Sequence, residues 1–166
     1  MKKLILRVIF LIVPLISFLG CQNTTNELSE SEKDSIKEEV REVFDESIKA
    51  ANAHDAAGML AHDWNSQDYL YASNGNLMKG WNAKSDAVQS IHTNPELQSY
   101  GVVLDEVILR VISRQVVIIT CTGHFSNFPK EQGPQDIKFV LTCLYEKING
   151  KWVMTVGHES THEQLF

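Results

Sequence analysis

The chain has 166 residues, with 15 Lys and Arg against 21 Asp and Glu, and a formal net charge of −6. This length suits one domain with a substantial core. Proteins that bind nucleic acid gather positive charge to meet the phosphates, and this acidic sequence has no basic cluster. Nucleic acid is therefore excluded as a partner. The sequence also lacks a glycine-rich phosphate loop and a serine nucleophile elbow.

Residues 1–20 have the features of an export signal. Lys2, Lys3 and Arg7 precede or open an apolar run over residues 4–19, which ends in Ser17-Phe18-Leu19-Gly20-Cys21. A basic start, a short apolar stretch and a small residue before the cleavage site are typical of a secretory signal peptide. The alternative is a single membrane-spanning anchor, for which the run is barely long enough.

Cys21 resembles the acylated cysteine of bacterial lipoproteins, although Phe18 stands where that family usually has Leu. The resemblance implies a signal peptide at 1–20, a lipid anchor (palmitate or a similar acyl chain) on Cys21, a tether at 21–30 and one domain at 31–166. By the lipoprotein sorting rule, Gln22 in place of Asp favours the outer membrane over the inner one. Loss of three basic groups with residues 1–20 changes the formal charge from −6 to −9. We therefore expect attachment to the cell envelope through lipid rather than through charge.

The segment after the tether predicts two helices. Ser29 and Glu32 form a capping-box pattern, and apolar residues then recur at helical spacing, at Ile36, Val40, Val43, Phe44, Ile48 and Ala51. Asp55 is placed to cap a second, shorter helix that runs to Trp64. A long amphipathic helix followed by a short one is the expected result.

The rest of the chain predicts a hairpin, a third helix and a β-meander. Residues 69–73 and 77–81 read as strands around a tight turn at Asn74-Gly75-Asn76, and a third helix starts at Asn82 or Ser85 and stops before Pro95. This helix is expected to turn Ala87, Val88 and Ile91 inward. Long β-rich runs follow at 102–112, 116–128, 137–148 and 152–160. Three helices before an antiparallel meander predict an α+β domain whose curved sheet wraps around the helices.

The last strand carries the strongest local signal. Asn149-Gly150 is typical of a two-residue type I′ hairpin turn, which requires positive φ at both positions. Counting outward from this turn, we expect Trp152, Met154, Val156, His158 and Ser160 on one side of the strand, and Val153, Thr155, Gly157 and Glu159 on the other. The first set is expected to form the floor of a half-buried pocket.

The order of elements, together with the closing Gly150-Lys151-Trp152…His158-Glu159-Ser160 strand, resembles the nuclear transport factor 2-like superfamily and, within it, the SnoaL-like group. The resemblance covers about residues 30–163. It implies a cone with a cavity between the concave sheet face and the helices, and a homodimer through the outer sheet face. Members of this superfamily include cyclases, isomerases and dehydratases that work without metal or organic cofactor, and also non-catalytic binding modules, so function does not follow from fold.

His158-Glu159-Ser160-Thr161-His162 fits the spacing of zinc proteases, but that chemistry needs a helix and a further ligand downstream. The motif lies in a predicted strand, and only four residues follow it, so no metal site is expected. A metal site built from Cys121, Cys143 and His158 has no short ligand spacing to support it. No cofactor is expected.

Pairing registers give a map of the expected cavity. With a two-residue turn, His158 faces Leu141, Val156 faces Cys143 and Ser160 faces Phe139; the preceding hairpin places Cys121 opposite Cys143 and Phe125 opposite Phe139. Cys121 and Cys143 are then either a cross-strand disulfide or small buried thiols. The aromatic residues expected to wall the cavity are Trp64, Tyr71, Trp81, Phe125 and Trp152, for which plain core packing is the alternative.

Two classes of function remain open. In one, the cavity binds a small hydrophobic molecule, or the domain serves as a module for a protein partner. In the other, His158 and Asp105 act together as a general base and its partner on such a molecule, because burial raises the pKa of a carboxyl group. Asp105 is the one carboxylate predicted on the pocket side of its strand; its alternative place is at a sheet edge or in solvent.

Overall fold

The computed structural model describes residues 27–162, so the expected signal peptide and Cys21 lie outside the described residues. Its helices are α1 (Glu30–Asn52), α2 (Ala56–Leu60) and α3 (Trp81–Thr93), followed by a short 3-10 turn, η1 (Pro95–Leu97). Its strands are β1 (Leu70–Ser73), β2 (Asn76–Lys79), β3 (Gly101–Ser113), β4 (Val116–Phe128), β5 (Gln135–Ile148) and β6 (Lys151–Thr161).

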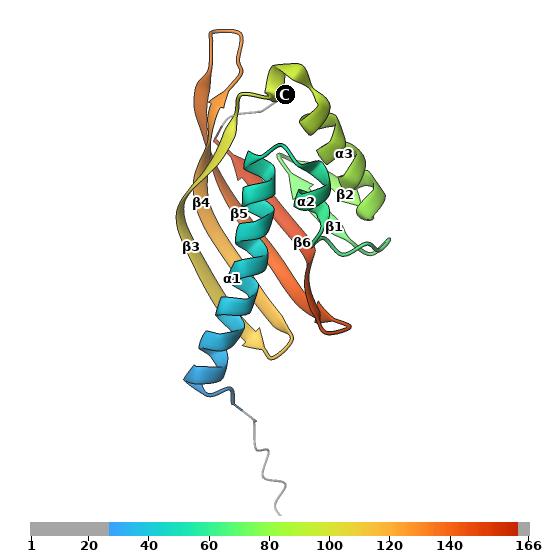
Figure 1. Cartoon of the computed structure of the whole chain (residues 1–166), viewed down its shortest axis with the longest axis vertical. Coiled ribbons are helices and arrows are strands. Elements are labelled where there is room, and N and C mark those ends of the chain that lie inside the picture. The colour runs from blue at the N-terminus through green and yellow to red at the C-terminus, as the bar shows by residue number, and fades with distance from the viewer. Residues whose placement is uncertain (1–26, 163–166) are drawn as a thin grey trace, which may run out of the picture.

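One sheet of six strands holds the domain together, in the order β2-β1-β6-β5-β4-β3. All described pairs are antiparallel except β1 with β6, which are parallel. Figure 1 shows α1 crossing one face of the curved sheet, with α2 and α3 near the β1–β2 end. The predicted α+β architecture is confirmed. Within residues 27–162, no helix is long and apolar enough to cross a membrane.

The long first helix forms as its sequence predicts. Ser29 Oγ accepts the N–H of Glu32, and the Glu32 carboxylate accepts the N–H of Ser29, which completes the capping box. The helix buries one stripe against the sheet, made of Ile36, Val40, Phe44 and Ala51. This stripe forms one wall of the main core, and the sheet forms the other.

The second helix ends at Leu60, four residues before the expected end at Trp64. Asp55 caps it as predicted, because its carboxylate accepts the N–H of Gly58. Beyond Leu60 the backbone bonds to β6 instead: Met154 N–H donates to His62 O at 2.7 Å, and Trp64 N–H donates to Met154 O at 2.9 Å. These two hydrogen bonds form a β-bridge between residues 62–64 and the last strand. They use backbone groups that a longer helix would need for its own hydrogen bonds.

The β5–β6 hairpin begins in the predicted register and then changes it. Asn149 and Gly150 have φ values of 52° and 79°, as a type I′ turn requires. Pairing runs regularly as far as Tyr145 with Met154, but Leu144 pairs with Val156, so Thr155 is an extra residue in β6. It forms a β-bulge, and its hydroxyl donates to Leu144 O at 3.5 Å.

The bulge reverses the faces of the rest of β6. Trp152 and Met154 are buried as expected, but from Thr155 onward the inward residues are Gly157 and Glu159. The prediction that Val156, His158 and Ser160 lie on the concave face is wrong, because one inserted residue moves every later side chain to the opposite side. These three side chains are exposed on the outer face.

The β4–β5 register also differs from the expected one, by two residues. Cys121 pairs with Leu141 and Ile119 with Cys143, so the predicted direct facing of Cys121 and Cys143 is wrong. Phe125 likewise pairs with Ile137 rather than Phe139. An even shift keeps the same side chains inward, and both cysteines are buried free thiols in the structure.

Asp105 does not face the pocket. It lies at a second bulge, between the paired residues Leu104 and Glu106, and Val107 occupies the expected place opposite Cys121. The Asp105 side chain is 54% exposed, and its Oδ1 lies 3.6 Å from Nδ1 of His124. Both residues lie on the outer side of the sheet.

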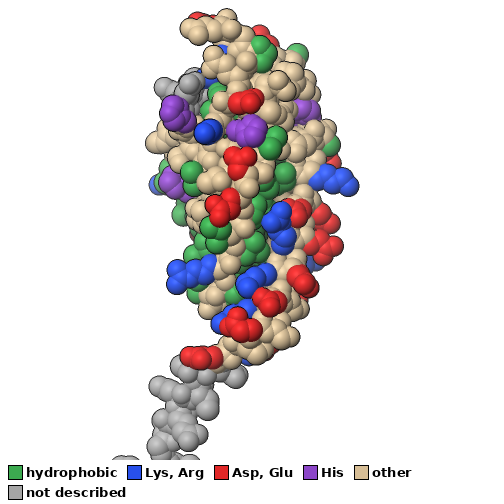
Figure 2. Space-filling view, turned by 90° about the vertical axis from the view of Figure 1, so that its left-hand side faces the viewer, with side chains coloured by type: hydrophobic (Ala, Val, Ile, Leu, Met, Phe, Trp, Pro, Cys, Tyr) green, Lys and Arg blue, Asp and Glu red, His purple; other side chains and the backbone are tan. Residues whose placement is uncertain are grey.

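The outer sheet face carries several large apolar side chains that remain exposed: Val103, Ile108, Ile112, Val140 and Val156. Figure 2 views the molecule from the β3 side and shows hydrophobic side chains at the surface between acidic and basic ones. Scattered exposed apolar residues are normal, but several on adjacent strands form a candidate contact surface.

Candidate functional site

A partly enclosed cavity lies between the helices and the concave face of the sheet. Its volume is about 90 Å³, and most of its lining is apolar or aromatic, including Phe44, Ile48, Phe125, Phe139, Leu141 and Met154. Two carboxyl groups and one amine share this lining, those of Asp63, Glu159 and Lys84. Such a combination of apolar walls and a few convergent polar groups is typical of ligand sites.

Lys84 reaches the cavity because it lies on the buried stripe of α3, one turn before Val88 and two before His92. Only 5% of the residue is exposed. Its ammonium lies over the ring of Tyr71, 3.4 Å from the centroid, and no hydrogen bond or ion pair to it is found within residues 27–162. Burial lowers the pKa of Lys84, while the charges of Asp63 and Glu159 oppose this effect.

Asp63 comes from the bridge that follows α2. Tyr69 donates its phenolic O–H to Asp63 Oδ2 at 3.2 Å. Burial raises the pKa of Asp63 from 3.8 to about 6, against the opposing effects of Lys84 and of the Tyr69 hydrogen bond. A carboxyl group with this pKa can exchange a proton near neutral pH.

Glu159 comes from the part of β6 that the bulge turns inward. Tyr71 O–H donates to its Oε2 at 3.2 Å, and Ser73 O–H donates to its Oε1 at 3.3 Å. Burial raises the pKa of Glu159, and Lys84 and the two hydrogen bonds lower it by less. The parallel pairing of Ser73 with Glu159 and of Tyr71 with Gly157 fixes these contacts.

The lining of this cavity therefore brings one amine together with two carboxyl groups of raised pKa. Of these three groups, the ammonium is the one without a hydrogen-bond partner within residues 27–162, since both carboxyl groups accept from hydroxyls. The arrangement can hold an oxygen atom of a guest at Lys84 and move a proton to or from it. No cluster of three His, Cys, Asp or Glu suited to a metal ion is found within residues 27–162.

The structure distributes the sequence-predicted site residues over several places. Tyr71 and Phe125 line the cavity. Trp152 is buried in the core, and its indole N–H donates to Glu39 Oε2 at 2.8 Å. Trp64 and Trp81 pack against the same core without lining the cavity.

The expected catalytic pair is not brought together. His158 is exposed on β6, and Asp105 pairs with His124 on the outer face. Sequence reasoning missed Lys84 and Asp63 and placed Glu159 on the wrong side. For Lys84 a signal was present, because a lysine four residues before Val88 falls on the apolar face of the predicted helix.

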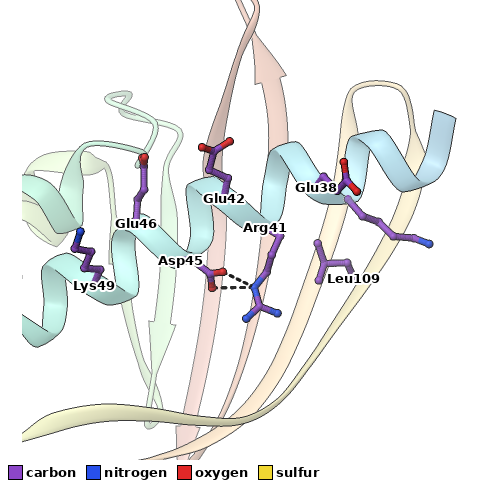
Figure 3. Close-up of a pocket in the computed structure, with 8 residues that line it drawn as sticks. Glu38, Arg41, Glu42, Asp45, Glu46, Lys49 and Leu109 are labelled. Atoms are coloured by element: carbon purple, nitrogen blue, oxygen red, sulfur yellow. Dashed lines mark hydrogen bonds and ion pairs between the residues drawn. The ribbon is translucent and has the colours of Figure 1, made fainter. Parts of the chain in front are cut away.

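A second, larger depression runs along the outside of α1. It has a volume of about 690 Å³ and is lined by Lys37, Glu38, Arg41, Glu42, Asp45, Glu46, Lys49 and Leu109. Figure 3 shows Arg41 and Asp45 pointing toward each other, and two hydrogen bonds of 2.8 Å join them. This is an open groove lined by charged side chains of α1, of which Arg41 and Asp45 pair with each other, so we assign the site to the more enclosed, apolar cavity instead.

The curved sheet around three helices, with a cavity inside, defines a protein of the nuclear transport factor 2-like class. A family model described as "SnoaL-like domain" matches residues 40–162. The chain therefore belongs to the SnoaL-like family. A comparison with curated proteins gave no match.

Solved structures with the same fold share little sequence with this chain. An NTF-2 like protein of unknown function from Shewanella oneidensis MR-1 is 20% identical, with 75% of this chain and 98% of that chain covered and a TM-score of 0.62. An NTF2-like protein from Streptomyces avermitilis, named as a candidate dehydratase, is 16% identical, with coverage of 76% and 96% and a TM-score of 0.65. The CaMKII hub of S. rosetta is 18% identical, with coverage of 75% and 95% and a TM-score of 0.64. These likenesses concern the fold.

Proposed function

We propose that the domain binds a small organic molecule in the cavity between the helices and the sheet, with an apolar body against the aromatic walls and one oxygen atom at Lys84. The observation that carries the proposal is the buried ammonium of Lys84, which no acceptor within residues 27–162 satisfies. A buried ammonium without a hydrogen-bond acceptor is costly, which supports a site kept for a guest.

The size of the cavity limits the guest. A volume of about 90 Å³, at roughly 10–15 Å³ for one water molecule, corresponds to a guest of up to about six to nine heavy atoms. The apolar walls formed by Phe44, Phe139 and Leu141 favour a hydrophobic body of that size.

A proton-transfer enzyme is the second candidate, and Asp63 is the observation that favours it. Its pKa of about 6 suits a general base or acid, and Lys84 can stabilise negative charge that develops on an oxygen of the substrate. Reactions of the isomerase, cyclase or dehydratase type need this pair of roles, and one structural neighbour is named as a candidate dehydratase. Asp63 and Lys84 here replace the expected pair of His158 and Asp105.

The test is mass spectrometry, under native conditions, of what copurifies with wild type, with Lys84→Met and with Lys79→Met. Met keeps most of the volume of Lys and removes the charge, and Lys79 is an exposed lysine on β2 that serves as the control. We expect a small ligand on wild type and on Lys79→Met, and at least tenfold lower occupancy on Lys84→Met. Equal occupancy in all three proteins would contradict the assignment to Lys84.

We also propose that the protein is anchored by lipid on Cys21 in the cell envelope, in the outer membrane rather than the inner one, with the signal peptide at 1–20 removed. The support is the lipoprotein-like pattern of the sequence. Membrane fractionation of wild type and Cys21→Ala tests it. Loss of lipid and of processing in Cys21→Ala supports the anchor, and unchanged membrane attachment contradicts it.

A homodimer through the outer sheet face completes the proposal. Its support is the set of exposed apolar side chains on β3, β5 and β6, including Ile108 at 54% and Val140 at 45% exposure. A neighbour of similar fold is a hub domain. A covered outer face leaves the cavity, on the opposite side of the sheet, free for its guest.

A further inference from the structure

We propose that the side-chain amine of Lys84 forms an imine with a small, uncharged aldehyde or ketone held in the cavity. This inference rests on the proposed function, because the carbonyl compound is the guest of the same cavity. It adds a covalent bond to what that proposal requires.

The placement of Lys84 separates it from the other lysines of residues 27–162. Several of these are held by carboxylates: Lys33 by Glu30, Lys37 by Asp34 and Lys147 by Glu39, at 2.7–2.8 Å. A nearby carboxylate favours the protonated form of an amine, which has no free lone pair. Lys84 is the one buried lysine in that range, and its ammonium lies over the face of the Tyr71 ring.

A lysine acts as a nucleophile only as the free amine, and desolvation in an apolar pocket favours that form. The cavity provides this desolvation, and the pKa of Lys84 is lowered as a result. Because Lys84 lies in the first turn of α3, the positive end of the helix dipole acts in the same direction. The geometry therefore provides an amine that is unpaired, buried and directed at the space a guest would fill.

The remaining groups complete the reaction. The nitrogen lone pair attacks the carbonyl carbon, the π electrons of the C=O bond move to oxygen, and one proton passes from nitrogen to that oxygen to give a carbinolamine. A proton delivered to the hydroxyl lets it leave as water while the C=N bond forms, and nitrogen gives up its last proton. Asp63, with a pKa of about 6, can deliver the proton that goes to the hydroxyl and receive the last proton that nitrogen gives up. The sum is amine plus carbonyl giving imine plus water, without oxidation or reduction.

The charge of the cavity selects the class of carbonyl compound. Asp63 and Glu159 lie on the same lining as Lys84 and repel a substrate that carries its own carboxylate. Small neutral aldehydes and ketones fit both this charge and the volume of about 90 Å³.

The test uses propanal with sodium cyanoborohydride at pH 7 on the intact protein. The reductant traps the imine as a stable propyl amine, which adds the mass of propanal less one oxygen atom. Peptide mapping by mass spectrometry then compares Lys84 with the exposed residues Lys79 and Lys151 in the same sample. We expect Lys84 to be modified at least tenfold faster than either, although it is less accessible. Equal or slower modification of Lys84 overturns the proposal, and this comparison within wild type needs no variant to fold.

Two further arms define the specificity. Glyoxylate, a carbonyl compound of similar size that carries a carboxylate, is expected to modify Lys84 at least tenfold more slowly than propanal does. Equal rates would overturn the uncharged substrate class. Lys84→Met is expected to lose the fast adduct while Lys79 reacts as before; an adduct of the same rate at another residue would overturn the assignment.

Propan-1-ol separates this inference from the proposed function, because it has the same carbon chain and forms no imine. Its binding is followed by the methyl signals of Leu141, a cavity residue, in an NMR titration. If propan-1-ol shifts these signals and propanal gives no fast adduct, the imine is wrong and the binding function stands. If neither molecule affects the cavity, both proposals fail.

Discussion

Gly157 of β6 lies directly against the ring of Tyr71 of β1: a Cβ atom at position 157 would be 2.5 Å from Tyr71 Cδ2 and 2.6 Å from Cε2. Real Cβ atoms do not approach other atoms this closely, so the ring occupies space that only glycine leaves open. The same ring supports Lys84 on its face and donates its O–H to Glu159. The position of the Tyr71 ring therefore links the amine of the cavity with one of its two carboxyl groups.

We expect Gly157→Ala to destabilise the protein by about 1–3 kcal/mol, as overpacking in a rigid core does. Chemical denaturation measures the free energy of unfolding. In a Tyr71→Ala background the obstructing ring is absent, so the same substitution should cost less than about 1 kcal/mol. A cost that is the same in both backgrounds would mean that Tyr71 is not the obstacle.

Asp63 should make the protein less stable as pH rises from about 4 to 6. Its folded-state pKa of about 6 lies above its ordinary value of 3.8, so the folded state binds the proton more tightly than the unfolded state does. This contribution is fully present below pH 3.8 and is lost as pH rises through 6, and two pKa units correspond to about 3 kcal/mol. Denaturation between pH 3.5 and 7 should show this decline in wild type and a smaller one in Asp63→Asn. Parallel curves would contradict the assignment.

Lys84→Met should raise stability although it removes the proposed binding group. A buried ammonium without an ion pair costs free energy, and Met fills a similar volume without that cost. We expect the free energy of unfolding to rise by about 1–3 kcal/mol at pH 5. At this pH Asp63 is mostly protonated, so removal of the Lys84 charge costs it little attraction. Thermal unfolding of the two proteins provides the measurement. A loss of stability would indicate that Lys84 is a structural residue.

The β6 bulge can be tested by two substitutions on the same strand. His158 points to solvent and Met154 lies in the core. His158→Lys should change the free energy of unfolding by less than about 0.5 kcal/mol, whereas Met154→Lys should cost about 3 kcal/mol or more. In a regular strand without the bulge, both side chains would point inward. Similar large costs at both positions would therefore argue against the extra residue.

The proposed dimer predicts that a charge on the outer sheet face separates the subunits. Ile108→Asp should shift the sedimentation coefficient at micromolar concentration from that of a dimer to that of a monomer, because an unpaired carboxylate would be buried in the contact. Leu77→Asp adds the same charge at an equally exposed apolar residue on β2, the other edge strand, and should leave the dimer intact. A wild-type protein that sediments as a monomer would refute the contact.

Much of the fold could be predicted because local signals agreed with the tertiary structure. The capping box at Ser29, the type I′ turn at Asn149-Gly150 and the period of the β-meander each have a physical cause within a few residues. The bulge at Thr155 has no such local signal. It lies where β6 meets both β5, its neighbour in the hairpin, and the bridge at His62–Trp64, which is a contact far apart in sequence.

The candidate site was harder to predict for the same reason. Successive side chains of a strand point to opposite faces, so a single extra residue makes Glu159 the inward residue in place of His158. Asp63 lies in an irregular segment, where no periodicity indicates a direction. Lys84 was overlooked because lysine is rarely buried, although its spacing from Val88 and His92 places it on the inner stripe of α3.

The parallel pairing of β1 with β6 also has a consequence for how the protein folds. Tyr71 and Glu159 are 88 residues apart in the chain, and at 5–20 residues per second the ribosome needs roughly 4–18 s to synthesise the segment between them. During that time the β1–β2 hairpin lacks its neighbour in the sheet, and Tyr71 and Lys84 remain in water. The helices and the first strands of the meander can form early, but the cavity closes only when the final strand docks. A nascent chain that stops before β6 therefore has most of the secondary structure and none of the site.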